Sequence, residues 1–133
     1  MSAFVTDLDL RVLRDAGGLP LRTRDGKQLY KLLQTFIYAS DIAGVIAVPK
    51  GFVTDLGSVP RLPIVFMMFG DRFQPAAVVH DFLYSAKSGP TVTRKMADDV
   101  LREACSVIGE PAWRRGAVWA AVRIGGMGRF EDR

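Results

Sequence analysis

The sequence predicts an α+β domain in which a small antiparallel N-terminal sheet is followed by three C-terminal helices. Short alternating or β-branched runs separated by turn residues fill residues 1–50, whereas apolar residues recur at helical spacing in residues 74–126. With 133 residues, 49% of them hydrophobic, the chain is long enough to bury a single core. We therefore expect one domain over residues 1–133, with a motif-bearing loop at 51–63 and a loose tail at 127–133.

Three segments carry the strand prediction. Residues 8–13 alternate apolar and charged side chains, which favours a half-buried strand. An Asp-Gly pair ending at Gly26 is typical of a hairpin turn. Residues 28–39 are ambiguous between helix and strand, but their aromatic content and the Ser-Asp turn that follows favour a strand. Residues 45–48 form a short β-branched run that Pro49 ends.

Three helices are expected in the second half of the chain. The first covers residues 74–86 and carries Pro75 in its opening turn, where proline is tolerated. The second covers residues 93–108, with Thr93 as its N-cap and a glycine just beyond its end. The third, residues 111–126, opens on a proline and ends at a pair of glycines.

Composition and charge exclude several classes of function. Cys105 is the single cysteine, so no internal disulfide forms, which suits a reducing compartment. The first ten residues include two aspartates and no apolar run, so no signal peptide is expected. The apolar run at 62–70 is too short to span a bilayer. The net charge is +4, but no aromatic–basic motif accompanies the arginines, so a nucleic-acid partner is not expected.

The only histidine of the chain, His80, is the first candidate for proton chemistry near neutral pH. Asp81 follows it directly, and Tyr84 lies one helical turn later. At about 100° per residue, these three side chains fall on one arc of the first helix, away from its apolar face. His80 and Tyr84 are i,i+4 neighbours and can converge on one partner.

Asp98, on the second helix, is the predicted partner. It lies at the edge of the core stripe, beside Leu101 and Cys105, whereas Asp99 points toward solvent as a surface charge. A half-buried aspartate needs a hydrogen-bond partner, which His80 or Tyr84 can supply. The same pattern also fits a histidine that is only a hydrogen-bonded structural residue, and the residues alone leave both interpretations open.

A longer pattern resembles a known family. The run VPKGFVTDLGSVPR at residues 48–61, HDFLY at 80–84 and Ala-Asp at 97–98 together resemble a family of small bacteriophage and prophage proteins of uncharacterised function (domain of unknown function 1353). The resemblance extends from about residue 36 to 125. It implies a phage or prophage origin, and hence a location in the bacterial host cytoplasm or in the virion, but no established biochemistry.

A shorter pattern is similar to the catalytic core of secreted and parvoviral phospholipases A2, which carry His-Asp-x-x-Tyr on one helix and an aspartate on the next. This likeness implies that His80 is the general base for a water and that Asp81 binds calcium. It also implies that Tyr84 and Asp98 hold the imidazole by hydrogen bonds, and that the substrate is a phospholipid.

The chain departs from those enzymes in two respects. Their disulfides are missing, and so is their glycine-rich calcium loop, for which residues 51–63 are the nearest substitute. Within this loop, the Asp55 carboxylate and the carbonyl of Gly57 are the candidate cation ligands, together with Asp81. The segment Thr54-Asp55-x-x-Ser58 also fits a turn held by side-chain hydrogen bonds.

Three functions follow from these patterns. The first is a calcium-dependent ester hydrolase acting on a phospholipid or another cell-envelope substrate. The second is a different hydrolysis, for example of the cell wall, in which Asp55, His80, Asp81 and Asp98 bind a transition metal that activates water, although these residues are a poor ligand set for zinc. The third is a non-enzymatic virion or assembly protein that contacts other phage proteins, in which the same residues and Arg61 form a buried polar network. An enzyme should keep His80 and Asp81 reachable from solvent, whereas a structural network should bury and satisfy them.

Overall fold

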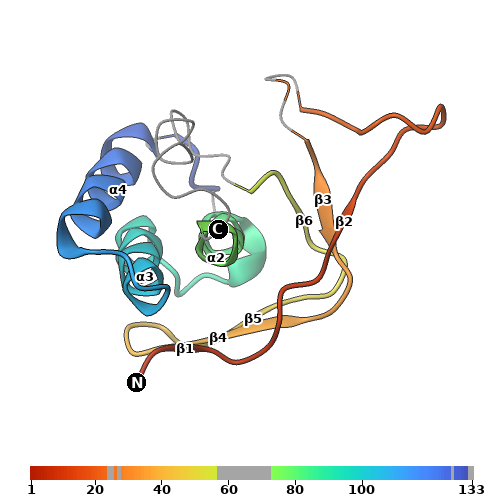
Figure 1. Cartoon of the computed structure of the whole chain (residues 1–133). Coiled ribbons are helices and arrows are strands. Elements are labelled where there is room, and N and C mark those ends of the chain that lie inside the picture. The colour runs from red at the N-terminus through yellow and green to blue at the C-terminus, as the bar shows by residue number, and fades with distance from the viewer. Residues whose placement is uncertain (24–25, 27, 57–72, 127, 132–133) are drawn as a thin grey trace.

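The computed structural model describes residues 1–23, 26, 28–56, 73–126 and 128–131, and these form the predicted α+β arrangement (Figure 1). The strands are β1 (Ala3–Phe4), β2 (Leu10–Val12), β3 (Tyr30–Leu32), β4 (Phe36–Ser40), β5 (Gly44–Val48) and β6 (Val53–Thr54). The helices are α2 (Gln74–Tyr84), the 3-10 helix η2 (Ala86–Ser88), α3 (Arg94–Val107) and α4 (Ala112–Gly125).

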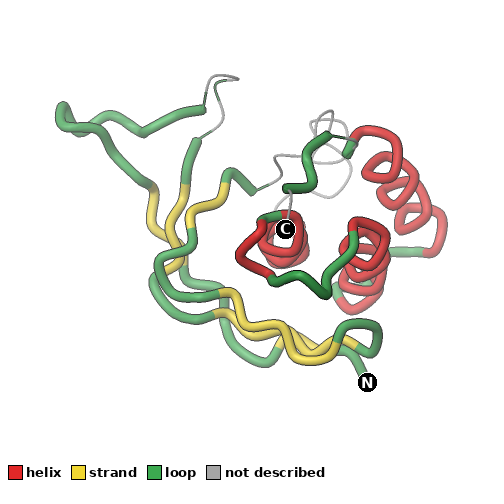
Figure 2. The backbone as a smooth tube through the Cα atoms, turned by 180° about the vertical axis from the view of Figure 1, so that it is seen from behind, coloured by secondary structure: helices red, strands yellow, loops and turns green. Residues whose placement is uncertain are grey.

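The strands divide between two antiparallel sheets rather than forming the single sheet that we predicted. One sheet has the order β1-β4-β5 and the other β2-β3-β6. In the first, Phe36 pairs with Val48 and Ser40 with Gly44 across a tight hairpin. In the second, Tyr30 of β3 pairs with Thr54 of β6. Seen from behind, the two sheets form a bent layer along one side of the helices (Figure 2).

The prediction that residues 28–39 form one continuous strand is wrong. The backbone N–H of Leu32 donates to the carbonyl of Phe52 at 2.9 Å, and that of Leu33 donates to Asp9 at 2.9 Å, so this stretch belongs to the β2-β3-β6 sheet. The chain then bends before β4 begins at Phe36 in the other sheet. Pairing with distant partners decides this break, and the local pattern does not reveal it.

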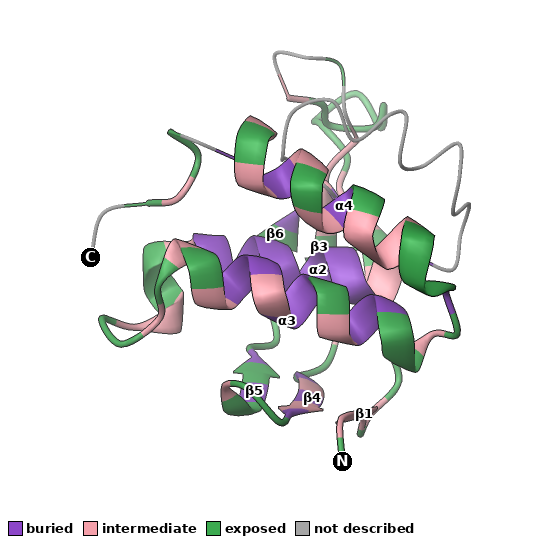
Figure 3. Ribbon diagram, turned by 90° about the vertical axis from the view of Figure 1, so that its left-hand side faces the viewer, coloured by how far each residue is buried: buried purple, intermediate pink, exposed green. Residues whose placement is uncertain are grey.

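Helix α2 lies at the centre of the molecule, and every residue from Ala76 to Tyr84 is buried (Figure 3). Helix α3 packs against it on one side, while β5 and β6 contact it from the sheets. Pro75 stands in its first turn, as predicted. The helix ends two residues earlier than expected because Ser85 is extended, with φ −77° and ψ 149°. Because α2 is enclosed, its polar side chains face protein rather than bulk water.

The caps of α3 and α4 follow the sequence prediction. Thr93 accepts a hydrogen bond from the backbone N–H of Met96 at 3.1 Å, and α3 ends at Val107 before Gly109. Pro111 precedes the first residue of α4. These helices complete the core, whose largest fully buried side chains include Leu32, Phe36, Tyr38, Val48, Phe73, Val78, Val79, Leu83 and Leu101.

The described part of the predicted loose tail is packed against α2. The Phe130 ring meets the Tyr84 ring edge to face, with centroids 5.5 Å apart. The backbone N–H of Glu131 donates to the carbonyl of Tyr84 at 2.9 Å, and the Glu131 carboxylate accepts from the N–H of Ala86 at 2.8 Å. Residues 128–131 therefore cover the C-terminal end of α2.

Among the helices of the described ranges, none has the length and apolar character needed to cross a membrane. The apolar run at 62–70 and most of the motif loop at 51–63 lie outside the described residues.

Candidate functional site

Asp98 is the centre of a buried polar network. Its side chain is 0% exposed, and its Oδ1 atom lies 2.9 Å from Nε2 of His80. The Tyr84 hydroxyl donates to the same oxygen at 2.7 Å. The prediction that Asp98 rather than Asp99 meets the first helix is therefore confirmed, as is the convergence of His80 and Tyr84 on one partner.

The second carboxylate oxygen of Asp98 faces two arginines. Arg123 of α4 donates to Oδ2 at 2.9 Å, and the Nη1 atom of Arg94 lies 3.6 Å from it. The Arg94 guanidinium also donates to the backbone carbonyl of Arg123 at 3.1 Å. One carboxylate thus joins α2, α3 and α4, and its buried charge is compensated by two cations whose side chains are 24% and 28% exposed.

These contacts set the protonation of the network. Burial alone would raise the pKa of Asp98, but hydrogen bonds from His80, Tyr84 and Arg123 lower it below its ordinary value. Burial, reinforced by the Asp98 carboxylate, raises the pKa of Tyr84. At neutral pH, Asp98 is therefore an anion that only accepts hydrogen bonds, and Tyr84 is a phenol that donates.

The acceptor also fixes the tautomer of His80. An ionised carboxylate has no proton to give, so Nε2 carries the hydrogen of this contact and Nδ1 of the neutral ring carries the lone pair. Nδ1 makes no hydrogen bond to another residue in the described part of the chain. Nδ1 is thus the unbonded ring nitrogen, and it belongs to a side chain that is only 2% exposed.

Tyr84 is held in place by close packing at its ring and at its hydroxyl. Its ring centroid lies 4.2 Å from that of His80, with 42° between the planes. A Cβ atom at position 126 would collide with the Tyr84 hydroxyl and with the carbonyl oxygen of Val122. Gly126 is therefore required by space, and it lets the phenol reach Asp98.

Asp81 points to a different environment. It accepts a short hydrogen bond from the Thr54 hydroxyl, and Thr54 in turn accepts one from the backbone N–H of Leu56 at 3.0 Å. Asp81 is 8% exposed and lines a pocket of about 270 Å³ between β6 and the end of α2. Asp55, Ser85, Lys87 and Glu131 also line this pocket.

The turn after β6 is strained at one residue. Leu56 has φ +59°, a left-handed conformation that costs a residue with a side chain about 1–2 kcal/mol. Its bond to Thr54 and its buried side chain stabilise this conformation. The predicted side-chain-held turn is thus confirmed for its Thr54–Leu56 half, while Ser58 lies outside the described residues.

The pocket brings together two of the three predicted cation ligands. The carboxylates of Asp55 and Asp81 both line it, and oxygen donors of this kind suit calcium. Gly57, the third predicted ligand, lies outside the described residues. The amine of Lys87 shares the pocket and would compete with a cation for these carboxylates.

The transition-metal alternative does not fit this geometry. Asp55, His80, Asp81 and Asp98 are all described, and the described residues hold no group of three or more His, Cys, Asp or Glu side chains that could bind a metal ion. His80 and Asp98 bond to each other at the junction of the three helices, while Asp55 and Asp81 line the pocket at β6.

Three residues of the network escaped the sequence analysis. Arg94 precedes Asp98 by four positions on one helix, and this i,i+4 spacing of opposite charges could have identified it. No local pattern identifies Arg123 or Gly126, because their partners, Asp98 and Tyr84, lie on other helices.

The comparisons with known proteins give a family but no activity. Residues 30–122 match the family described as "Protein of unknown function (DUF1353)". The match covers more than half of the chain, and so the protein belongs to this family. It includes His80, Asp81 and Asp98 and ends one residue before Arg123. No curated protein matches the chain. No solved structure matches it either.

Proposed function

We propose that the protein is a phage- or prophage-encoded ester hydrolase that uses His80 as its general base and acts on a phospholipid or another ester of the cell envelope. The observation that carries the proposal is the bonding of Asp98. His80 and Tyr84 share its Oδ1 atom while Arg123 holds Oδ2, which fixes the carboxylate and the ring and leaves Nδ1 as the basic nitrogen. The His-Asp-x-x-Tyr order, similar to that of phospholipases A2, supports the same assignment.

In this proposal Nδ1 of His80 takes a proton from a water as the water oxygen attacks the ester carbonyl. The imidazolium then returns the proton to the departing alcohol oxygen as the ester C–O bond breaks. Asp98 stabilises the imidazolium by its charge, and Tyr84 fixes the carboxylate that bonds to the ring. General-base catalysis of this kind contributes typically 10²–10⁴ in rate.

Calcium is the proposed cofactor, with Asp81 and Asp55 as its side-chain ligands and the carbonyl of Gly57 as a further one. When bound, such a hard cation polarises a carbonyl and stabilises the charge that develops on its oxygen. The chain's own contribution is the Thr54 hydroxyl, which orients the Asp81 carboxylate toward the pocket.

The test compares wild type, His80→Gln and Asp81→Asn on vesicles that contain anionic phospholipid, with fatty-acid release followed in calcium or in EDTA. Wild type should hydrolyse the lipid in calcium, and His80→Gln should be slower by at least about 100-fold. Asp99→Asn is the matched control, because it removes the neighbouring carboxylate that faces away from the network. Equal rates in wild type and His80→Gln, or no release by folded wild type, would refute the proposal.

Calcium binding has a readout that does not depend on activity. Saturating calcium at about 100 times its dissociation constant should stabilise wild type by about 2.7 kcal/mol, and the rise in Tm should vanish in Asp81→Asn. A rise that persists in Asp81→Asn would remove Asp81 from the cation site without bearing on His80.

A second candidate is a structural or assembly protein of the phage particle, with other virion proteins as partners. Its supporting observation is burial: His80, Asp81 and Asp98 are 2%, 8% and 0% exposed, as we expect of a structural network, whereas an enzyme should keep His80 reachable from solvent. On this alternative the network serves only to join three helices, so His80→Gln lowers stability and no ester is hydrolysed. The first candidate places the protein in the host cytoplasm or the virion, and the second in the virion.

A further inference from the structure

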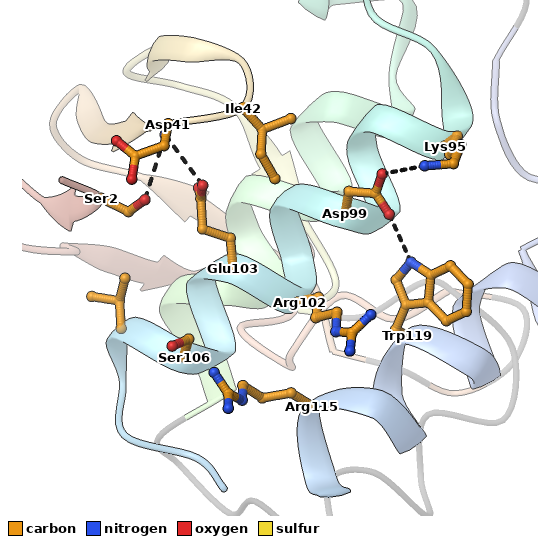
Figure 4. Close-up of a pocket in the computed structure, with 11 residues that line it drawn as sticks. Ser2, Asp41, Ile42, Lys95, Asp99, Arg102, Glu103, Ser106, Arg115 and Trp119 are labelled. Atoms are coloured by element: carbon orange, nitrogen blue, oxygen red, sulfur yellow. Dashed lines mark hydrogen bonds and ion pairs between the residues drawn. The ribbon is translucent and has the colours of Figure 1, made fainter. Parts of the chain in front are cut away.

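A second pocket, of about 790 Å³, lies beside α3 on the face that carries Asp99 (Figure 4). Helices α3 and α4 form two of its walls, and the β4–β5 turn and the N-terminal segment complete it. The hydrolase site does not use this pocket, because Asp98 faces α2 whereas Asp99, the next residue, lines this cavity.

The acidic side chains that α3 contributes to the pocket are already engaged. Asp99 accepts from Lys95 at 2.7 Å and from the indole Nε1 of Trp119 at 2.8 Å. Glu103 accepts from the hydroxyl of Tyr38 at 2.7 Å. These bonds fix the walls and the position of the indole, and they occupy the carboxylates that could otherwise neutralise an arginine.

Two guanidinium groups of the pocket have no such partner. Arg102 of α3 and Arg115 of α4 lie within 4 Å of no carboxylate in the described part of the chain. By contrast, Arg123 of the same helix α4 pairs with Asp98. The guanidinium carbon of Arg102 lies 5.7 Å from the centre of the Trp119 ring. The pocket therefore joins two available guanidiniums to a flat aromatic surface.

From this juxtaposition we infer an unassigned binding site for a small ligand that carries a phosphate or carboxylate group on a flat ring. Arg102 and Arg115 bind the oxyanion, because guanidinium groups match its geometry with paired, charge-assisted hydrogen bonds. The ring packs against Trp119, whose indole is held by Asp99. The hydroxyl of Ser106, beside Arg115 in the pocket, is a further donor to the anion (Figure 4).

The test measures binding of adenosine 5′-monophosphate, 4-nitrophenyl phosphate and benzoate. Inorganic phosphate and adenosine, the two parts of adenosine 5′-monophosphate, are measured separately for comparison. Titration calorimetry is combined with tryptophan fluorescence in a Trp113→Phe background, since Trp113 is the other tryptophan and is 63% exposed. At least one ring-bearing anion should bind and quench Trp119, and it should bind more tightly than either phosphate or adenosine alone.

Arg102→Gln and Arg115→Gln should each weaken that binding by at least about tenfold, as expected for loss of a charge-assisted hydrogen bond. Arg11→Gln is the matched control, because it removes the same charge from an exposed position on β2 outside the pocket. Binding in the control should stay within about twofold of wild type.

Two outcomes would overturn the inference. One is that none of the ring-bearing anions binds the folded protein. The other is that Arg11→Gln weakens binding as much as Arg115→Gln does, since the attraction would then come from net charge rather than from the pocket. Both outcomes are independent of whether His80 supports ester hydrolysis.

Discussion

His80 and Asp81 are neighbours on α2, yet their side chains meet opposite surroundings. His80 belongs to a network in which Asp98 of α3 is bonded from α2 and from α4. Asp81 is held by one hydroxyl from β6 at the edge of a pocket. A step of about 100° around one helix separates an imidazole fixed by hydrogen bonds from a carboxylate that lines a pocket. The comparison teaches that hydrogen bonds fix His80 in place, whereas the pocket gives a ligand access to Asp81.

Removing the centre of the network should have the largest effect. Asp98→Asn leaves Arg123 and Arg94 facing an uncharged amide, and breaking a buried ion pair in this way costs about 3–5 kcal/mol of unfolding free energy. Chemical denaturation measures this loss. Asp99→Asn is the control and should cost less than about 1 kcal/mol, because it loses only the ion pair with the exposed Lys95 while its amide oxygen can still accept from Trp119. Equal losses would show that Asp98 has no special role.

Crowding the Tyr84 hydroxyl should have the next largest effect. Gly126→Ala introduces a Cβ atom into space that this hydroxyl occupies, and overpacking of this kind costs about 1–3 kcal/mol. Gly116→Ala is its control, since the helix interior around Gly116 leaves the added Cβ without close neighbours. That variant should gain about 0.5–1 kcal/mol from helix propensity. Thermal unfolding of both variants measures the two effects, and a stabilised Gly126→Ala would contradict the packing described here.

At the pocket that Asp81 lines, Thr54→Val should lower the free energy of unfolding by about 1–2 kcal/mol. The change removes a hydroxyl that donates to Asp81 and accepts from Leu56. The expected loss is smaller than that for Asp98→Asn, since Asp81 lines a pocket where water can replace the hydroxyl. Urea denaturation compares the two variants. A larger loss for Thr54→Val would reverse the contrast between the two sides of α2.

Mild acidification should have the smallest effect. Because the folded pKa of Asp98 is lowered, its contribution to stability is fully present above the ordinary aspartate pKa of about 4 and is lost as pH falls through the lowered value. The stability difference between wild type and Asp98→Asn should therefore be constant from pH 7 to about pH 5 and shrink only at lower pH. A difference that already shrinks above pH 5 would contradict a lowered pKa.

The sequence predicted the features that depend on nearby residues. It did not predict the features that depend on contacts between distant parts of the chain. Thr93 caps α3 and Asp98 faces α2 because capping and helical spacing are properties of nearby residues. The division of residues 28–39 between two sheets depends on strands from other parts of the chain. Arg123 was missed for the same reason, since its partner lies on another helix. Gly126 was missed because its requirement is space beside Tyr84, which no local pattern records.

The central claim is that Asp98 holds His80 with Nε2 protonated and Nδ1 basic, and the single histidine of the chain makes it directly measurable. Nitrogen-15 NMR of the imidazole at neutral pH yields one pair of ring signals. The account predicts a protonated Nε2 and an unprotonated Nδ1 in wild type. A hydrogen on Nδ1 of the neutral ring in wild type would contradict it.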